Sequence, residues 1–524
     1  MKTLIELREF SLYALLFAII STFLAAKFAK RNKKNGKRPP EVAGSWPVIG
    51  HLHLLGGRNQ LLHKTLGAMA DKYGPIFSIR LGTNPAIVVS DREIVKECFT
   101  TNDRVFSTRP KFLALKIMGY NQTLFGFAPY GRYWRDIRKL VMVELLSGQR
   151  LELLEHVRDS ETSLLMKELY DKSSKNGGQV IVEVKKRLAD MAIDIIVRMI
   201  SGKRYFSADA KGNQETKRCQ ETVRNFFYLA GLNLVSDAVP MLGWLDSVRG
   251  FKGTMKRTAR ELDSMLGSWV KEHRRIRLNG SINEEEKDFI HVMLSTMDDS
   301  NISADEADTT VKATCLSLLT GGSGPTAVAL IWPLALLLNN RSVLKKAQDE
   351  LDTHVGKHRQ VAETDIKNLV YLQAIVKETF RLHPSSPLSA AREAMEDCTV
   401  AGFHIPAGTR LLVNLWKLHR DPNIWADPLE FQPERFLKEH ANLDVGGQDF
   451  EFTPFGSGRR ACPAVTFAVQ VVHLTLARLL HGFELRTVSD TPVDMTESPG
   501  LTVPKAAPLE VVLRPRLPPV AYEF

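Results

Sequence analysis

The sequence predicts a mainly α domain with minor β structure, an α+β fold, that is preceded by one transmembrane helix. Three observations predict it: mostly helical apolar patterns from about residue 90 to 385, short β-rich runs near both ends of the folded part, and a charge-free apolar segment at the N-terminus. The 524 residues are 44% hydrophobic and 25% charged, which excludes a disordered chain and a protein with many membrane spans.

The N-terminal segment predicts a membrane anchor. Residues Phe10 to Ala26 carry no charge, and this length suits the thinner bilayer of the endoplasmic reticulum. Seven basic residues follow between Lys27 and Arg38, which predicts that the rest of the chain stays in the cytosol. A cleaved signal peptide and a core helix are the alternatives, and both fit the basic flank less well. Residues 1–38 are therefore expected to form the anchor and its basic stop segment.

The net charge of +11 belongs mostly to this basic segment. Without these seven residues, and without two charges of each sign in residues 1–26, 61 basic and 57 acidic residues remain. A nucleic-acid binder of this size usually keeps a basic face in its folded part. The expected partner is therefore the lipid bilayer, and we expect no nucleic acid.

The cysteines predict a reducing compartment. The chain has five, and the closest two in sequence, Cys398 and Cys462, are 64 positions apart. This spacing indicates neither a disulfide framework nor a zinc site. Any functional cysteine is expected to act alone.

After the anchor, the sequence predicts a hinge, then a small β-rich part, then helices, and finally strands near the C-terminus. Three prolines and two glycines in residues 39–50 predict a stiff hinge. The runs IFSIRLG and PAIVVS predict a small β-rich part, and LKKAQDELDTHVG predicts a helix that ends at Gly356. Strands return around 398–415 and in LEVVLRPRL near the C-terminus. Residues 51–524 are expected to form a single domain.

The strongest chemical signal is PFGSGRRAC at residues 454–462. Its two glycines permit a tight loop, and an apolar helical run follows it. Cys462 would then lie near a helix N-terminus, where the dipole and backbone N–H groups favour a thiolate. Arg460 can pair with a carboxylate. A cysteine on such a loop suits thiolate ligation of haem iron, whereas the alternative is a buried structural cysteine.

With this loop the chain resembles the cytochrome P-450 haem-thiolate enzymes, in particular plant microsomal members that oxidise flavonoids, coumarins, terpenoids and alkaloids. The resemblance covers nearly the whole chain, and phrases such as KYGPIF, FAPYGRYWR and LWKLHRDPNIW carry it. It implies the cytochrome P-450 fold, a helical haem-enclosing domain, with heme b as the cofactor. Phe455, Gly458, Arg460 and Cys462 fit its F-x-x-G-x-R-x-C motif, with Cys462 as the metal ligand.

The resemblance also implies roles for residues outside this loop. WRDIR matches W-x-x-x-R, in which the tryptophan and the arginine face the haem propionates, and another segment supplies a third propionate ligand. KETFR and FQPERF match the E-x-x-R and P-E-R-F elements of a buried network that supports the haem loop. The propionate residues are Trp134, Arg138 and Arg392, and the network residues are Glu378, Arg381 and Arg435.

The chain departs from the family pattern in its central helix. The family carries [AG]-G-x-[DE]-T-[TS] there, but Gly324 replaces the acid and Pro325 the threonine. These two positions normally serve proton delivery during dioxygen activation, which neither replacement can provide. A bulge at Pro325 would bring Thr326 or Ser323 toward the haem, so these two are the candidate catalytic residues. Pro333 is expected to distort the helix further, and Ala464 stands where the family has glycine.

Three hypotheses follow for the function. The first is a monooxygenase with an atypical relay, which takes NADPH electrons through a membrane-bound NADPH-cytochrome P-450 reductase. The second is a haem-thiolate isomerase or lyase that needs no dioxygen. The third is a non-catalytic haem- or ligand-binding relative. An intact framework around one altered motif favours the first.

The substrate is expected to be lipophilic. Candidate pocket-lining segments lie near residues 112–127, 317–326, 385–391 and 499–505. They are largely apolar, as most small-molecule pockets are, so they do not identify the substrate.

Overall fold

The computed structural model describes residues 36–57, 61–205, 214–232, 234–280, 287–298, 303–489, 491–500 and 502–523. The predicted membrane helix and most of the basic segment lie outside these residues. The predicted hinge, 39–50, contains no helix in the structure. Its backbone forms isolated bridges to Ser78 and Leu81 of the first strand, and one within the hinge between Trp46 and Gly50.

The strands form three small sheets, as the short β-rich runs predict. The largest has the order β1-β2-β7-β4, in which β2 and β7 are parallel and the other pairs antiparallel. A second sheet has the order β3-β9-β8, and β5 pairs with β6 in the third. The strands are β1 Ile76–Leu81, β2 Asn84–Val89, β3 Val180–Glu183, β4 Arg392–Glu393, β5 Cys398–Val400, β6 Phe403–Ile405, β7 Arg410–Val413, β8 Phe483–Thr487 and β9 Glu510–Pro515.

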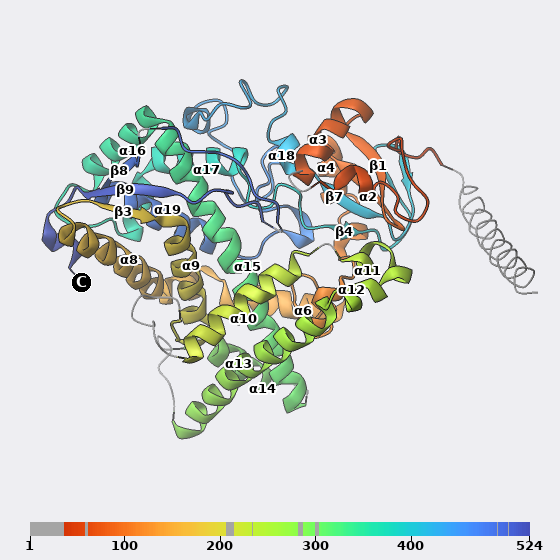
Figure 1. Cartoon of the computed structure of the whole chain (residues 1–524), viewed down its shortest axis with the longest axis horizontal. Helices are drawn as coiled ribbons and strands as arrows, with labels where there is room; N and C mark the ends of the chain where they lie inside the picture. Colours follow the sequence, from red (N-terminus) through yellow and green to blue (C-terminus); the bar gives the residue numbers. More distant parts are fainter. Residues whose placement is uncertain are drawn as a thin grey trace, which may run out of the picture.

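Helices form most of the described chain, which confirms the mainly α prediction (Figure 1). The α-helices are α2 Leu52–Leu55, α3 Leu62–Tyr73, α4 Arg92–Phe99, α5 Leu113–Met118, α6 Arg132–Leu140, α7 Gly148–Leu153, α8 Glu155–Lys175, α9 Val184–Ser201, α10 Gln214–Ala230, α11 Val235–Ala238, α12 Trp244–Val248, α13 Phe251–Asn279, α14 Phe289–Asp298, α15 Ala304–Asn339, α16 Arg341–His354, α17 Val370–Leu382, α18 Leu415–Leu418 and α19 Val465–Gly482. Short 3-10 turns include η1 Val105–Ser107, η7 Pro433–Leu437 and η8 Gly458–Arg460, and Val141–Leu145 forms a π-helical turn. The predicted helix that ends at Gly356 is α16, which stops two residues earlier.

Helix α15 is the centre of the domain. The Ser303 hydroxyl caps its N-terminus by accepting a hydrogen bond from the N–H of Glu306 at 3.3 Å. Two acidic residues in the first turn interact favourably with the positive end of the helix dipole. The helix continues through Pro325 and Pro333 to Asn339. The structure therefore shows one continuous helix at the two prolines where a bulge and a further distortion were expected. Packing against α9 and α19 holds this buried helix where two backbone hydrogen bonds are missing.

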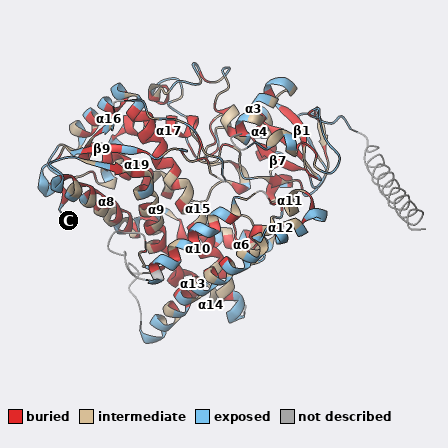
Figure 2. Ribbon diagram, viewed as in Figure 1, coloured by how far each residue is buried: buried red, intermediate tan, exposed pale blue. Residues whose placement is uncertain are grey.

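The core surrounds α15, α17 and α19, and buried residues fill the middle of the molecule (Figure 2). Two smaller apolar clusters lie against the β1-β2-β7-β4 sheet. By length and hydropathy alone, α15 and α19 are capable of crossing a membrane, as is a bent pair of segments, Thr216–Ala238 and Pro240–Val248, if the pair is one span. Most of α15 and α19 is buried in the domain, so we treat both as interior helices.

Candidate functional site

Cys462 lies on a closed loop just before α19. Its backbone N–H donates to the carbonyl of Phe455 at 3.0 Å, and the N–H of Ala461 donates to Gly458 at 3.0 Å. The ring of Phe455 packs edge-on against Phe380 of α17, with centroids 5.3 Å apart. The loop is therefore fixed at both ends and presents the thiol beside the start of α19.

Gly458 is required by the path of this loop. Its φ is +67°, a conformation that L side chains rarely adopt. A Cβ atom there would also collide with the carboxylate of Asp103, which accepts hydrogen bonds from the backbone N–H of Arg459 at 3.1 Å. The absence of a side chain at Gly458 thus lets the segment that carries Asp103 pack against the loop.

The pKa of the buried Cys462 thiol is set by opposing effects. Burial raises its pKa, whereas a hydrogen bond from the N–H of Ala464 and the charge of Arg138 act to lower it. The predicted stabilisation of the thiolate by a backbone N–H at the helix start is therefore present, but the effect of burial on the pKa is larger. A metal cation reverses this balance, because a coordinating thiol is deprotonated.

Two of the predicted cofactor-binding residues, Arg392 and Arg460, are buried beside this loop. Arg460 donates to the carbonyl of Ala128 at 2.6 Å and lies over the ring of Trp134 at 4.1 Å. Arg392 donates to the carbonyl of Ser457 at 2.6 Å and pairs with Asp103 at 3.4 Å. Both guanidinium groups are thus held in place by the protein backbone.

A third and a fourth guanidinium group lie in the same cluster. Arg138 of α6 donates to the carbonyl of Ala461 at 2.8 Å, next to the cysteine, and lies 5.6 Å from the ring of Trp134. Arg109, which the sequence analysis missed, donates to the carbonyl of Ala391 at 2.9 Å. No local motif marks Arg109, because its neighbours come from segments far away in the sequence.

The electrostatics of this arginine cluster (Arg109, Arg138, Arg392 and Arg460) suit a negatively charged ligand. Burial, then repulsion from Arg392 and Arg138, lowers the pKa of Arg460 to about 9. Burial lowers the pKa of Arg392 to about 10, and burial with repulsion from the other three lowers that of Arg109. Among the described residues, Asp103 is the carboxylate that pairs with the cluster.

This donor set fits the haem that the resemblance implies. A buried thiol with Arg138 beside it, next to a cluster of four arginines that Asp103 alone pairs with among the described residues, suits a ligand that brings a metal cation to the sulfur and negative charge to the arginines. The two propionates of haem supply such charge, and guanidinium groups suit carboxylates. The residues present therefore fit the cofactor.

The predicted network behind the loop is present and fully buried. Arg381 donates to both carboxylate oxygens of Glu378, at 2.7 and 2.8 Å, and Arg435 donates to the same carboxylate at 3.1 Å. Arg381 also donates to the carbonyl of His419 at 2.8 Å, and the ring of His419 accepts from the N–H of Thr453 at 3.2 Å. The network thus reaches the residue just before the PFGSGRRAC loop.

The structure does not bring Ser323 and Thr326 to one open face of α15. The Ser323 hydroxyl donates back to the carbonyl of Leu319 at 2.6 Å. Thr326 lies one turn after Gly322, where a Cβ atom would collide with Ile196 of α9, so it shares the face that packs on α9. By contrast, a Cβ atom on Gly321 would meet nothing within 4 Å. The relay role of the two hydroxyls stays a prediction.

One cavity involves a predicted pocket-lining segment. A space of about 410 Å³ lies between α5, α13 and the first half of α15, and residues from 117–120 line it. On its wall, Asp263 accepts from Lys312 at 2.5 Å and from the Tyr120 hydroxyl at 3.2 Å. None of the residues around Cys462 line this cavity.

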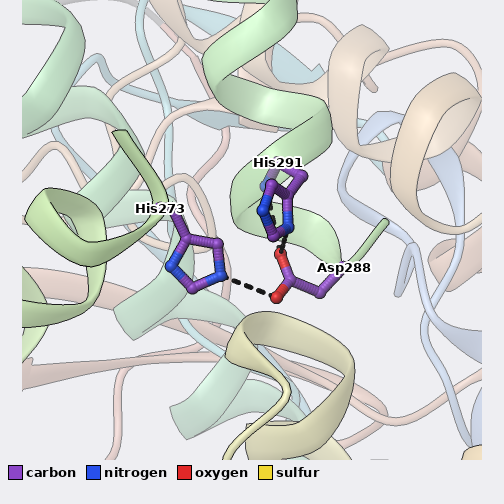
Figure 3. Close-up of side chains that lie close together, drawn as sticks. All are labelled: His273, Asp288 and His291. Atoms are coloured by element: carbon purple, nitrogen blue, oxygen red, sulfur yellow. Dashed lines mark hydrogen bonds and ion pairs between the residues drawn. The ribbon is translucent and has the colours of Figure 1, made fainter. Parts of the chain in front are cut away.

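A second cluster of titratable groups lies away from the cysteine (Figure 3). Asp288 accepts from Nε2 of His273 at 2.7 Å and from Nδ1 of His291 at 2.9 Å, and these are hydrogen-bond distances. Nδ1 of His273 lies 2.7 Å from the carbonyl oxygen of Trp269, so both ring nitrogens face acceptors, which favours the imidazolium form. The cluster joins α13 to the start of α14.

Comparison with known proteins agrees with this geometry. The family model described as Cytochrome P450 matches residues 39–511. The chain is 51% identical over 516 residues to xanthotoxin 5-hydroxylase of Arabidopsis thaliana, covering 97% of this chain and 98% of that protein. It is 50% identical over 528 residues to strychnine-10-hydroxylase of Strychnos nux-vomica, covering 98% and 100%.

The fold is similar to that of solved structures. A zebrafish cytochrome P450 determined with progesterone superposes with a TM-score of 0.72 at 24% sequence identity, covering 88% of this chain and 100% of that one. At this identity the likeness concerns the fold alone.

Proposed function

The chain belongs to the cytochrome P450 family, and from this premise we propose that it is a haem-thiolate monooxygenase of plant specialised metabolism. Its substrate is a lipophilic terpenoid, flavonoid, coumarin or alkaloid. The hydroxylase names of its relatives support this class of reaction. The observation that carries the proposal is Cys462 on its closed loop beside the arginine cluster, with which Asp103 pairs.

In this proposal Cys462 supplies the axial thiolate, and the arginine cluster and Trp134 hold the two propionates. Bound there, haem supplies one-electron and dioxygen chemistry, and its thiolate ligand favours O–O cleavage. The protein fixes the thiol through the loop and its supporting network. Ala464 contributes its backbone N–H to the sulfur, which glycine would do equally well, so the departure at this position leaves that contact intact.

The overall reaction consumes dioxygen, NADPH and one solvent proton, inserts one oxygen atom into the substrate, and releases water and NADP⁺. We propose that a membrane-bound NADPH-cytochrome P-450 reductase delivers the electrons. The enzyme would be anchored in the endoplasmic reticulum by residues 1–38, with 39–50 as hinge and 51–524 as the cytosolic domain. The basic cluster after the apolar segment supports this orientation.

The test uses membranes reconstituted with the reductase, NADPH and a panel of plant metabolites. Oxygenated product that carries ¹⁸O from labelled dioxygen is the expected result. The reduced protein with carbon monoxide should show the thiolate band, and Cys462→Ser should abolish it. A Cys462→Ser protein that keeps this band would remove Cys462 from the metal site.

The altered turn of α15 supports one alternative, a haem-thiolate isomerase or lyase. Gly324 and Pro325 remove the acid and the hydroxyl that dioxygen chemistry uses, but rearrangement of an already oxygenated substrate requires neither. Turnover in the absence of NADPH and dioxygen would establish this alternative against the monooxygenase.

A further inference from the structure

Two imidazole rings and one carboxylate point toward one another in the cluster that lies away from Cys462 (Figure 3). His273 of α13, Asp288 just before α14 and His291 in the first turn of α14 are all buried. The two rings have centroids 4.3 Å apart, and one donor atom from each of the three side chains lies within 4.8 Å of the other two. Imidazole nitrogen and carboxylate oxygen are donor atoms that zinc takes in proteins.

The backbone orients two of these three donors. Nδ1 of His273 lies 2.7 Å from the carbonyl oxygen of Trp269, which directs Nε2 to Asp288. The carboxylate of Asp288 accepts from the backbone N–H of His291 at 3.0 Å, which holds it in place. Metal-binding histidines commonly donate their other ring N–H to a backbone carbonyl or a carboxylate in this way. The surroundings of the cluster therefore have the form that a metal site requires.

The ring of His291 has a nitrogen that these hydrogen bonds leave unused. Its Nδ1 lies 2.9 Å from the Asp288 carboxylate, whereas its Nε2 is buried without a hydrogen-bond partner among the described residues. Buried polar atoms are almost always paired, so an unpaired one requires an explanation. The hydrogen bonds to Asp288 thus do not satisfy the whole cluster, although all three side chains are buried.

The space beside the carboxylate permits a cation and a water ligand. A tetrahedral zinc ion with bonds of about 2.0–2.2 Å sets its donor atoms about 3.3–3.5 Å apart. The nitrogen–oxygen separations are 2.7 and 2.9 Å, so each would open by roughly half an ångström. Gly202, after α9, is exposed, and a Cβ atom on it would lie 3.8 Å from Oδ2 of Asp288 and meet no other atom within 4 Å except those of its chain neighbours. Oδ2 therefore borders an open side of the cluster.

We propose that His273, Asp288 and His291 bind one zinc ion, which connects α13 to α14 beside the end of α9. The ion takes one nitrogen from each ring and oxygen from Asp288, and a water on the side of Gly202 completes the coordination. Only neutral imidazole coordinates a metal, so binding releases the additional proton of His273 to solvent. The carboxylate supplies the negative charge that a buried cation needs. The proposal does not depend on the monooxygenase function.

The experiment uses the haem-loaded full chain, purified without a histidine tag from zinc-supplemented cells. His273→Gln and His291→Asn each place an amide N–H near the ring nitrogen that faces Asp288, so they keep a donor to the carboxylate but lose the zinc ligand. His156→Gln is the control, because His156 is exposed on α8. The molar ratio of zinc to haem should be about one in the wild type and in the control, and below about one tenth in the other two variants.

Two further measurements separate zinc coordination from a purely hydrogen-bonded connection. Wild-type crystals should show an anomalous-scattering peak at the zinc edge, about 2.0–2.2 Å from a nitrogen of each ring and an oxygen of Asp288. Zinc should raise the unfolding temperature of the wild type by about 3–5 °C over chelator-treated protein, and that of His273→Gln or His291→Asn by less than about 1 °C.

A wild type with less than about a tenth of an equivalent of zinc would overturn the proposal, as would either variant that keeps its zinc or an anomalous peak elsewhere. These outcomes are independent of turnover, so a wild type that forms no oxygenated product would contradict the monooxygenase function and leave the zinc measurement intact.

Discussion

Single residues fix the chemistry of this protein where segments distant in the sequence meet. Asp103, before η1, touches both the glycine turn and Arg392, so one carboxylate orders the loop and balances part of the arginine cluster. Burial, then repulsion from Arg392 and Arg138, lowers the pKa of Arg460 to about 9, so negative charge brought by a ligand would stabilise the cluster.

Replacing Gly458 with alanine tests the fit of the loop. The backbone cost of a left-handed alanine is about 1–2 kcal/mol, and the collision with Asp103 adds to it, because that carboxylate is held by Arg392. We expect Gly458→Ala to lower the unfolding temperature by several degrees and to reduce the haem content of the purified protein. Gly253→Ala in α13, where a Cβ atom meets nothing, is the control and should be neutral or stabilising. Equal haem loading of both variants would refute this account of Gly458.

The sequence alone identifies those site residues that belong to a short local motif. Cys462, Arg460 and Gly458 were identifiable from nine consecutive residues. Arg109 was not, since its role depends on contacts with residues 390–391 and on the fields of three other arginines. Ser385 was within a segment expected to line the pocket, but its bond to Pro325 required the folded chain.

Buried ion pairs connect the secondary-structure elements behind the Cys462 loop. Glu378 of α17 accepts from Arg381, Arg435 and the N–H of Gln432, so one carboxylate connects α17 to η7. Removing one member of such a buried group leaves uncompensated charge, whereas exposed pairs contribute little.

Glu378→Gln tests this tie. We expect it to destabilise the folded protein by roughly 3–5 kcal/mol, because Arg381 and Arg435 lose their shared charge partner. Denaturant unfolding of the haem-loaded protein measures this, with the haem absorbance followed in parallel. Asp349→Asn removes the exposed pair with Lys345 and should cost less than about 1 kcal/mol. Similar losses in both variants would contradict a supporting role for the network.

The tie between α13 and α14 has a predictable pH dependence. Burial alone would lower the pKa of His273, but the hydrogen bond and charge of Asp288 outweigh it and raise the pKa. Burial would raise the pKa of Asp288, and its hydrogen bonds from His273 and His291 outweigh that effect and lower it. The His273 contribution is therefore complete below its ordinary value of 6.5 and is lost as the pH rises through the folded pKa. The Asp288 contribution is complete above 3.8 and is lost as the pH falls through the folded pKa.

Asp288→Asn should therefore be most damaging between these two ordinary values, near pH 5–6, by about 3 kcal/mol. The deficit relative to the wild type should shrink toward high pH, where His273 becomes neutral. Urea unfolding at a series of pH values measures it, and Asp171→Asn on the exposed side of α8 is the control. A deficit that is constant from pH 5 to 9 would show that the charge of His273 does not contribute.

Periodicity and turn residues predicted the helical region, the helix α16 and the strands β1, β2, β5 to β7 and β9, but not β3 and β8. At α15, two prolines predicted a bulge and further distortion. The helix is continuous because α9 and α19 pack along it, and packing is not visible in a local window.

For the whole molecule, the large size of the domain follows from its central helix. The 36 residues of α15 extend about 54 Å, and helices α9, α13, α14, α17 and α19 pack along it. The domain is therefore built around this helix, and the N-terminal segment that we propose as the membrane anchor lies outside the described residues, apart from its last three, 36–38.

The charge distribution predicts how that segment orients the molecule. Deleting residues 1–38 should move the protein from the carbonate-resistant membrane fraction to the soluble fraction, because the folded part retains a net charge of only +4. Changing the seven basic residues between Lys27 and Arg38 to glutamine should keep the protein in the membrane fraction, since the apolar span is intact. It should nevertheless mix its orientation, because each Lys or Arg near an anionic leaflet contributes about 1 kcal/mol and their asymmetry sets the cytosolic side. Protease protection of intact microsomes measures the orientation: the wild-type domain should be fully digested, and the glutamine variant partly protected. Full digestion of both would mean that the folded domain, and not the basic segment, determines the side on which this enzyme works.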